Sequence, residues 1–212
     1  MKIHRTFIAA ACISIALISS ADAQLLGRGA FGFGLSAGGN MMQSNWKTKD
    51  PGYGAAIDLS YSLGHHWGLA SSLGFDEYKG QNWSNQNVLS TTIHGSLGLS
   101  YAFLPDKHLN PFIFAGPGIV YYRPRIDNGA VILDGKVKTW EFALMGGVGF
   151  DYYLSESWSV IVTGEAGLMG NDIVDGYAGG KGNDILQRVS IGVRYYLFDR
   201  STVEKILEAV RK

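Results

Sequence analysis

Apolar and polar residues alternate along two neighbouring stretches, residues 142–154 and 158–168, which flank the short polar turn Ser155-Glu156-Ser157. In the first stretch the even-numbered positions other than Gly146 are large and apolar, while most odd-numbered positions are small or polar. Successive side chains of a strand leave opposite faces, so this period of two predicts β-strands. The short turn between the two stretches predicts an antiparallel hairpin with one apolar and one polar face.

The same alternation recurs along the rest of the chain. It predicts further strands at residues 30–37, 53–63, 67–75, 89–103, 111–123 and 184–198. The facing of strand 111–123 is ambiguous, because two sets of apolar residues compete for the outward side. Pro117 cannot donate a ladder hydrogen bond, so we expect a β-bulge at Gly116-Pro117-Gly118 that switches the facing partway.

The predicted connections alternate between long and short. Long loops are expected at residues 39–52, 76–87, 124–138 and 169–183, and shorter connections at 64–66, 104–110 and 155–157. Bacterial membrane barrels have long outer loops and short periplasmic turns. The pattern therefore predicts an all-β fold, an eight-stranded antiparallel transmembrane β-barrel, with apolar faces toward lipid and small polar faces toward the lumen.

Aromatic residues recur where the even-numbered strands end and the next strands begin. These residues include Tyr61, Trp67, Tyr101, Tyr152, Trp158 and Tyr195, and we expect them to form a girdle at the periplasmic rim. The opposite girdle is expected from Phe75, Tyr121, Tyr122 and Trp140.

Composition supports a barrel that does not bind nucleic acid. Charged residues are only 17% of the chain and the formal net charge is +0, so no basic surface for nucleic acid is indicated. The chain has 29 glycines, which suit the close approaches of a narrow lumen.

The two ends of the chain predict export and a tail. Residues 1–23 have the charged start, apolar core and Ala21-Asp22-Ala23 cleavage site of a signal peptide. Cys12, the only cysteine, lies inside that segment. The barrel is assigned to residues 24–198, and residues 199–212 to a short amphipathic helix whose capping box is Ser201 and Glu204.

The hairpin FALMGGVGFDYYLSESWSV and the final strand resemble the small outer-membrane β-barrel family of the OmpA and OmpX type. In the final strand, a pattern similar to the assembly signal of such barrels is formed by Ser190, Gly192, Tyr195, Leu197 and Phe198. The resemblance implies a monomer in the outer membrane that contacts membrane lipid and lipopolysaccharide and is inserted by the barrel assembly machinery. The chain departs from the pattern by continuing past Phe198.

Charged residues on the predicted inward faces indicate an interior ion-pair network. Isolated buried charge is very costly, so we expect Glu165, Arg188 and Arg194 to pair at the centre of this network, which also includes Asp58 and Glu141. Glu165 falls opposite Arg188 if the last two strands fold symmetrically. The network is expected to be structural, and the alternative is a narrow gated pore for ions or small solutes.

Candidate catalytic and metal-binding residues are few. His94 and Ser96 share an inward face, similar to the pair of lipid A deacylases, but no acid is clearly placed to orient the histidine. A lipid A-modifying hydrolase is therefore only a remote alternative, and no metal, cofactor or catalytic site is expected. A conduit for hydrophobic solutes is disfavoured because the positions predicted to face the lumen are mostly glycine and polar residues. The function expected is a structural or surface-interaction role carried by four outer loops.

Overall fold

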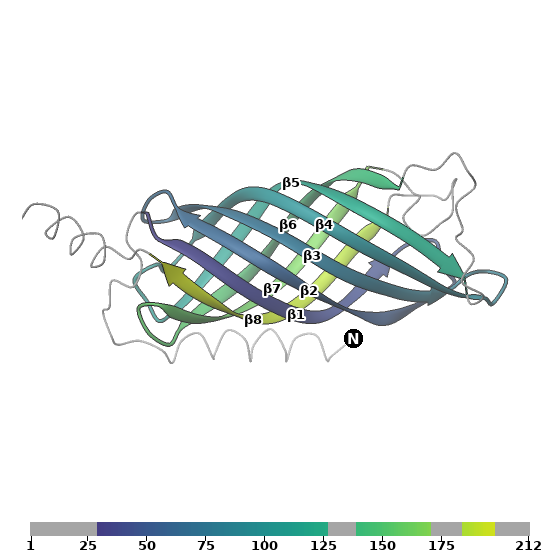
Figure 1. Ribbon diagram of the computed structural model, residues 1–212, viewed down its shortest axis with the longest axis horizontal. Helices are drawn as coiled ribbons and strands as arrows, with labels where there is room; N and C mark the ends of the chain where they lie inside the picture. Colours follow the sequence, from purple (N-terminus) through teal and green to yellow (C-terminus); the bar gives the residue numbers. More distant parts are fainter. Residues whose placement is uncertain (1–28, 127–138, 171–183, 198–212) are drawn as a thin grey trace, which may run out of the picture.

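The computed structural model describes residues 29–126, 139–170 and 184–197, which form one closed antiparallel barrel (Figure 1). Its strands are β1 (Phe31–Gln43), β2 (Thr48–Ser62), β3 (Trp67–Gln81), β4 (Asn87–Ala102), β5 (Leu109–Ile126), β6 (Trp140–Tyr153), β7 (Trp158–Met169) and β8 (Ile185–Leu197). Each strand pairs with the next, and β1 pairs with β8 to close the wall. The predicted eight-stranded barrel is confirmed. The predicted signal peptide and C-terminal helix lie outside the described residues.

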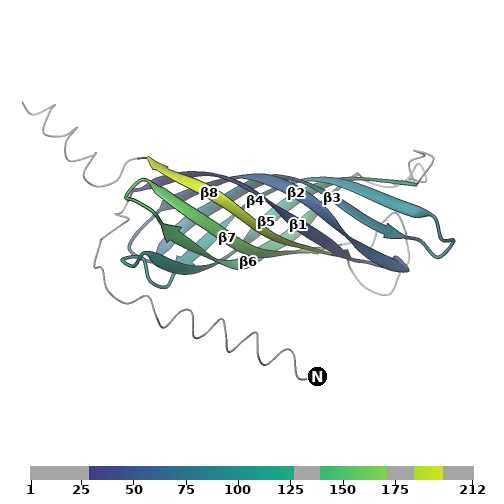
Figure 2. The ribbon, with the colours of Figure 1, turned by 90° about the horizontal axis from the view of Figure 1, so that it is seen from below.

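The barrel is elongated, and its strands are inclined to the long axis (Figure 2). We call the end where β1 begins and β8 ends the terminal end, and the opposite end, which carries the β1–β2 and β3–β4 turns, the distal end (Figure 1). In the part of the chain that the structure describes, no helix is both long and apolar enough to cross a membrane.

Large apolar side chains cover the outside of the wall, as the alternation predicts. Phe142 and Val189 are 63% and 66% exposed, and every strand contributes such residues. Their neighbours in sequence, among them Ser36, Arg188 and Ser190, are buried inside. An apolar exterior around a polar interior is the arrangement of a membrane barrel.

The first two distal connections are not long loops, and this prediction is wrong. β1 and β2 continue to Gln43 and from Thr48, which leaves only residues 44–47 between them. β3 and β4 are joined by residues 82–86. Met42, Trp46 and Tyr78 are buried in this region. Ladder hydrogen bonds and the packing of these inward side chains therefore stabilise the strands beyond the point where the outward apolar pattern ends.

The predicted bulge in the fifth strand is also wrong. The β5–β6 register runs unbroken from Leu109 to Tyr121, and the β4–β5 register is the same on both sides of Pro117. Even-numbered residues of β5 face inward throughout. The pairing of β2 with β3 does shift register, between Asp50 and Tyr53.

Outward-facing aromatic residues lie toward both ends of the barrel. At the terminal end, Trp67 contacts Tyr101 and Trp158 contacts Tyr195, with ring centroids 5.0 Å and 4.8 Å apart. Toward the distal end, the register aligns Phe75, Ile93, Tyr121 and Trp140 in one outward-facing row across β3 to β6. Tyr122, predicted for this girdle, is fully buried in the lumen instead, because it is even-numbered on a strand without a bulge.

Candidate functional site

Polar side chains gather in two clusters inside the barrel. Both are built around arginines that β8 points inward, Arg188 and Arg194, which are buried. The two positions are six residues apart, roughly 20 Å along a strand. We call the group around Arg188 the distal cluster and the group around Arg194 the terminal cluster.

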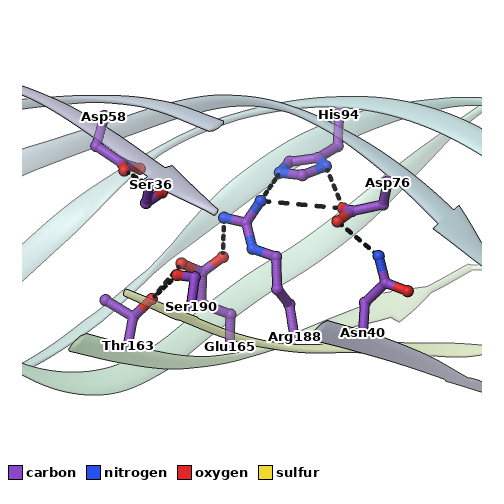
Figure 3. A network of polar contacts seen from close by, with 9 residues as sticks. All are labelled: Ser36, Asn40, Asp58, Asp76, His94, Thr163, Glu165, Arg188 and Ser190. Atoms are coloured by element: carbon purple, nitrogen blue, oxygen red, sulfur yellow. Dashed lines mark hydrogen bonds and ion pairs between the residues drawn. The ribbon is translucent and has the colours of Figure 1, made fainter. Parts of the chain in front are cut away.

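Arg188 lies between two carboxylates in the distal cluster (Figure 3). Its Nη2 is 2.7 Å from Oε2 of Glu165, and its Nη1 is 3.9 Å from Oδ2 of Asp76. Glu165 comes from β7, where it is the register partner of Arg188, while Asp76 comes from β3. A buried carboxylate without a cation is very costly, so one guanidinium stabilises both acids.

His94 of β4 bridges the same two groups. Its Nδ1 is 3.1 Å from Oδ2 of Asp76, and its Nε2 is 3.4 Å from Nη1 of Arg188. A guanidinium only donates hydrogen bonds, so Nε2 accepts from Arg188 and Nδ1–H donates to Asp76. The other carboxylate oxygen, Oδ1, accepts from Nδ2 of Asn40 at 2.9 Å. Asp76 is therefore held from β1, β4 and β8 at once.

Two hydroxyls complete the cluster. Thr163 Oγ1 donates to Oε1 of Glu165 at 3.0 Å and lies 2.7 Å from Oγ of Ser190. Because the Thr163 hydrogen is used on Glu165, Ser190 donates to Thr163. This chain of donors fixes the orientation of the Glu165 carboxylate toward Arg188.

Gly74 makes room for the distal cluster. A Cβ at this position of β3 would collide with the His94 ring and lie 2.9 Å from Nη1 of Arg188. On β1, a Cβ at Gly32 would lie 2.9 Å from Cδ of Arg194. Inward glycines thus leave the volume that the two arginines occupy.

The terminal cluster is smaller. Nη1 of Arg194 is 2.9 Å from Oδ2 of Asp151, and Ser159 Oγ donates to Oδ1 of Asp151 at 3.0 Å. Nη1 also lies 3.4 Å from the Tyr196 hydroxyl, and the Tyr196 ring centroid is 5.7 Å from that of Tyr153. These two buried tyrosines cover the cluster on the side of the terminal end.

The structure places the residues predicted for one central network in different surroundings. Glu165 meets Arg188, but Arg194 pairs with Asp151 and not with Glu165. Asp58 accepts a hydrogen bond from Ser36 at 2.8 Å. Glu141 lies toward the distal end, where it is the register partner of Val120. The single predicted network is therefore replaced by two clusters, because Arg188 and Arg194 lie too far apart along β8 to share one acid.

Sequence reasoning missed Asp76 as a site residue. The loop predicted at residues 76–87 removed it from the barrel, whereas β3 continues past it to Gln81. A signal was present, since Asp76 has the even parity of the other inward residues of that strand, such as Gly74 and Tyr78.

An apolar cluster fills the distal part of the lumen. Its members are Met42, Trp46, Tyr78, Val88, Val120, Tyr122, Ala143, Met145, Met169 and Leu186. The sequence predicts an interior of glycine and polar residues, and this is wrong in the distal part of the lumen. Inward apolar residues come from β1 and from β3 to β8 there, because the strands continue beyond the stretches that the alternation predicts. The cavity beside this cluster and the polar distal cluster has a volume of about 10 Å³, which is too small for a solute.

Side chains divide the rest of the interior into small spaces. A cavity of about 40 Å³ lies between the two polar clusters, and one of about 80 Å³ lies at the terminal end. Phe112 and Arg194 line both and lie between them. A single water needs about 10–15 Å³, so these spaces suit a few waters rather than a larger solute.

His94 and Ser96 are not arranged as an accessible catalytic pair. Asp76 does orient His94 as the acid of a triad would, but the far nitrogen Nε2 faces Arg188 rather than a serine hydroxyl. The imidazole is only 3% exposed. Ser96 lines the cavity between the clusters. Among the described residues, no group of three or more His, Cys, Asp or Glu could hold a metal ion.

The residues of the predicted assembly signal divide between the two faces of β8. Ser190 is buried at the distal cluster and Gly192 also faces inward, while Tyr195 and Leu197 face outward. Phe198 lies outside the described residues. Its role in assembly stays a prediction.

A closed barrel with an apolar exterior and paired charges inside is the arrangement of a small outer membrane barrel. Residues 8–196 match the family described as outer membrane protein beta-barrel domain. The chain belongs to this family and is an outer membrane β-barrel protein. Among curated proteins, no sequence matches it significantly.

Solved structures of outer membrane proteins share the fold. Neisserial surface protein A (NspA) has 18% identity and a TM-score of 0.54, over 79% of this chain and 99% of its own. Ail of Yersinia pestis, in complex with the heparin analogue sucrose octasulfate, has 10% identity and a TM-score of 0.53, over 80% and 99%. OprG of Pseudomonas aeruginosa has 13% identity and a TM-score of 0.52, over 83% and 99%.

Proposed function

We propose that this protein is a closed, non-enzymatic barrel that acts at the cell surface through the tips of its distal hairpins. In this orientation the terminal end faces the periplasm, as expected for a barrel with both chain ends there. The observation that carries the proposal is a contrast between the two parts of the barrel. Its interior is filled by paired charges and an apolar cluster, whereas the β1–β2 and β3–β4 turns at the distal end form an ordered surface.

The β3–β4 turn is held by the side chain of Asn82. Its Oδ1 accepts from the backbone N–H groups of Ser84 and Gln86 at 3.0 Å and 2.9 Å, and its Nδ2 donates to Oε1 of Gln86 at 2.8 Å. Asn85 takes the left-handed backbone conformation, with φ of 59°, which asparagine tolerates better than most residues. These bonds order the turn without help from a partner.

The β3–β4 turn is also tied to the β1–β2 turn. Lys47 Nζ donates to Oδ1 of Asn85 at 2.6 Å, and Trp83 Nε1 donates to the carbonyl oxygen of Asn45 at 3.0 Å. Trp83 remains 71% exposed. The indole N–H, the only donor of this side chain, is used within the protein. A partner would therefore contact the apolar face of the indole.

The residues around this indole are mostly amides and hydroxyls. Gln81, Ser84, Gln86 and Asn87 lie in or beside the same turn. A side-chain amide both donates and accepts hydrogen bonds, as sugar hydroxyls require. Sugar rings also have an apolar face of C–H groups that packs on an aromatic ring. The chemistry of the tip therefore fits a carbohydrate, and exposed tryptophan is a frequent source of binding energy at interfaces.

A glycan array tests this proposal. Vesicles that carry the full chain are applied beside vesicles with Trp83→Ala and vesicles without the protein. We expect at least one glycan class to retain the wild-type vesicles and the Trp83→Ala signal to fall at least tenfold. Wild-type vesicles that bind like empty ones, or a variant that binds like wild type, would overturn the surface role of the tip.

Planar bilayer recordings test the closed interior separately. The purified chain is expected to leave the membrane at its baseline conductance, because side chains divide the lumen. Steady single-channel steps would instead establish the pore alternative.

A further inference from the structure

The distal boundary of the lipid-facing belt is marked on one side of the barrel. Phe75, Ile93, Tyr121 and Trp140 form the outward row described above, and aromatic residues of barrels lie at the level of the lipid headgroups. Outward positions beyond this row on β3 to β5 therefore lie beside headgroups rather than acyl chains.

Charge appears on the outer wall directly beyond that row. The outward residues there include Lys79, Arg123 and Arg125, with Glu77 and Asp50 beside them. By contrast, the outward residues near the distal ends of β7, β8 and β1 are uncharged, namely Leu168, Ile185, Gln187, Met41 and Gln43. Cations thus occupy one arc of the wall at headgroup level.

A groove of about 440 Å³ lies on this charged arc. Its lining is Asp50, Lys79, Gly80, Asn87, Val88, Leu89, Arg125 and Ile126. The register puts Lys79 opposite Leu89, and Leu89 opposite Arg125. The two cations are therefore two strand spacings apart, about 10 Å, with apolar Leu89 between them. One phosphate group can be reached by both long side chains from these positions.

The cations differ in how far the protein already uses them. Lys79 Nζ is 3.1 Å from Glu77 and 5.0 Å from the centre of the Tyr53 ring on β2. The side chain therefore leans away from Arg125 and has to turn toward β4 to share a phosphate with it. Within the described ranges, neither Arg123 nor Arg125 takes part in an ion pair, and Nε of Arg125 is buried without a hydrogen-bond partner. A guanidinium has five donors in a planar fork that matches phosphate.

We propose that this groove binds the phosphate of a phosphorylated glycolipid in the membrane leaflet around the distal end. Arg125 and Lys79 hold the phosphate on either side of Leu89, Arg123 lies one row closer to the acyl chains, and Ile93 contacts the acyl region. The carboxylate of Asp50 accepts hydrogen bonds from sugar hydroxyls. Charge complementarity and the level of the groove favour this occupant, and the inference does not depend on the role of the Trp83 tip.

Lipid binding by the full chain in detergent tests the groove, read by native mass spectrometry. The three probes are diphosphorylated lipid A, the same lipid A after enzymatic removal of its phosphates, and phosphatidylglycerol. The variant is the double substitution Arg123→Gln and Arg125→Gln. Its matched control is Lys107→Gln, which removes a positive charge from the turn between β4 and β5 at the terminal end.

We expect the wild type and the control to bind diphosphorylated lipid A equally. Removal of the phosphates, or the double substitution, is expected to weaken binding at least tenfold, and added salt is expected to weaken it as well. Equal binding by the double variant would overturn the site. Equal binding of dephosphorylated lipid A would overturn the role of phosphate. Phosphatidylglycerol binding as tightly as lipid A would overturn the choice of a glycolipid. Heat-modifiable gel mobility confirms that each variant is folded.

Discussion

The two buried clusters differ in their balance of charge. The terminal cluster pairs one arginine, Arg194, with one carboxylate, Asp151. The distal cluster holds one arginine, Arg188, between the carboxylates of Glu165 and Asp76. Because its acids outnumber its arginine, the distal cluster needs more support, and it draws hydrogen bonds from five strands rather than from three. The barrel therefore depends more on Arg188 than on Arg194.

Removal of each arginine is expected to give the largest difference. Arg188→Met leaves two buried carboxylates without their cation, and we expect it to lower the free energy of unfolding by about 5 kcal/mol. Arg194→Met leaves one such carboxylate, so we expect a loss of about 3 kcal/mol. Urea titrations of the folded barrel in detergent micelles, followed by tryptophan fluorescence, measure both. Equal losses would mean that the number of stranded acids does not govern stability.

Crowding of the distal cluster is expected to have an intermediate effect. Gly74→Ala places a Cβ against the His94 ring and Arg188, and overpacking of this kind costs about 1–3 kcal/mol. Gly164→Ala is the matched control, because a Cβ there meets nothing within 4 Å. The same urea titration compares the two variants. A control that loses as much stability as Gly74→Ala would show that strand glycine itself, and not the cluster, is responsible.

Loss of a single hydroxyl is expected to have the smallest effect. Thr163→Val removes the donor to Glu165 and the acceptor of Ser190, so we expect a loss of about 2 kcal/mol. Ser159→Ala removes only the donor to Asp151 in the terminal cluster, with an expected loss of about 1 kcal/mol. The reverse order would contradict the view that the distal cluster relies more on its supporting hydrogen bonds.

The sequence predicts the strands well where lipid enforces the pattern. Between the girdles every second side chain must be apolar, so the inward facing of Arg188, Arg194 and Glu165 follows from the alternation alone. Beyond the distal girdle this constraint ends, and strands continue through polar residues. That is why the extension of β3, and with it Asp76, was missed.

The partners of the inward residues could be predicted only in part. Glu165 and Arg188 are register partners on adjacent strands, so simple symmetry about their loop finds them. Asp76 reaches Arg188 across the lumen from β3, and Asp151 reaches Arg194 from β6. Contacts across a closed barrel depend on strand tilt and side-chain length, which a one-dimensional pattern does not contain.

Pro117 leaves a break in the wall at the seam between β4 and β5. The ladder lacks the pairs of Leu97 with Pro117 and of Gly98 with Gly116, although the register is the same on either side. A proline has no N–H to donate, and hydrocarbon cannot replace the lost bond. A Cβ at Gly98 or Gly116 would collide with the backbone of the facing strand. The backbones of β4 and β5 therefore stay close together where the ladder hydrogen bonds between them are interrupted. The β5–β6 ladder on the other side of Pro117 is continuous. We therefore expect the backbone amides beside this gap to exchange with deuterium sooner than those of the β5–β6 ladder.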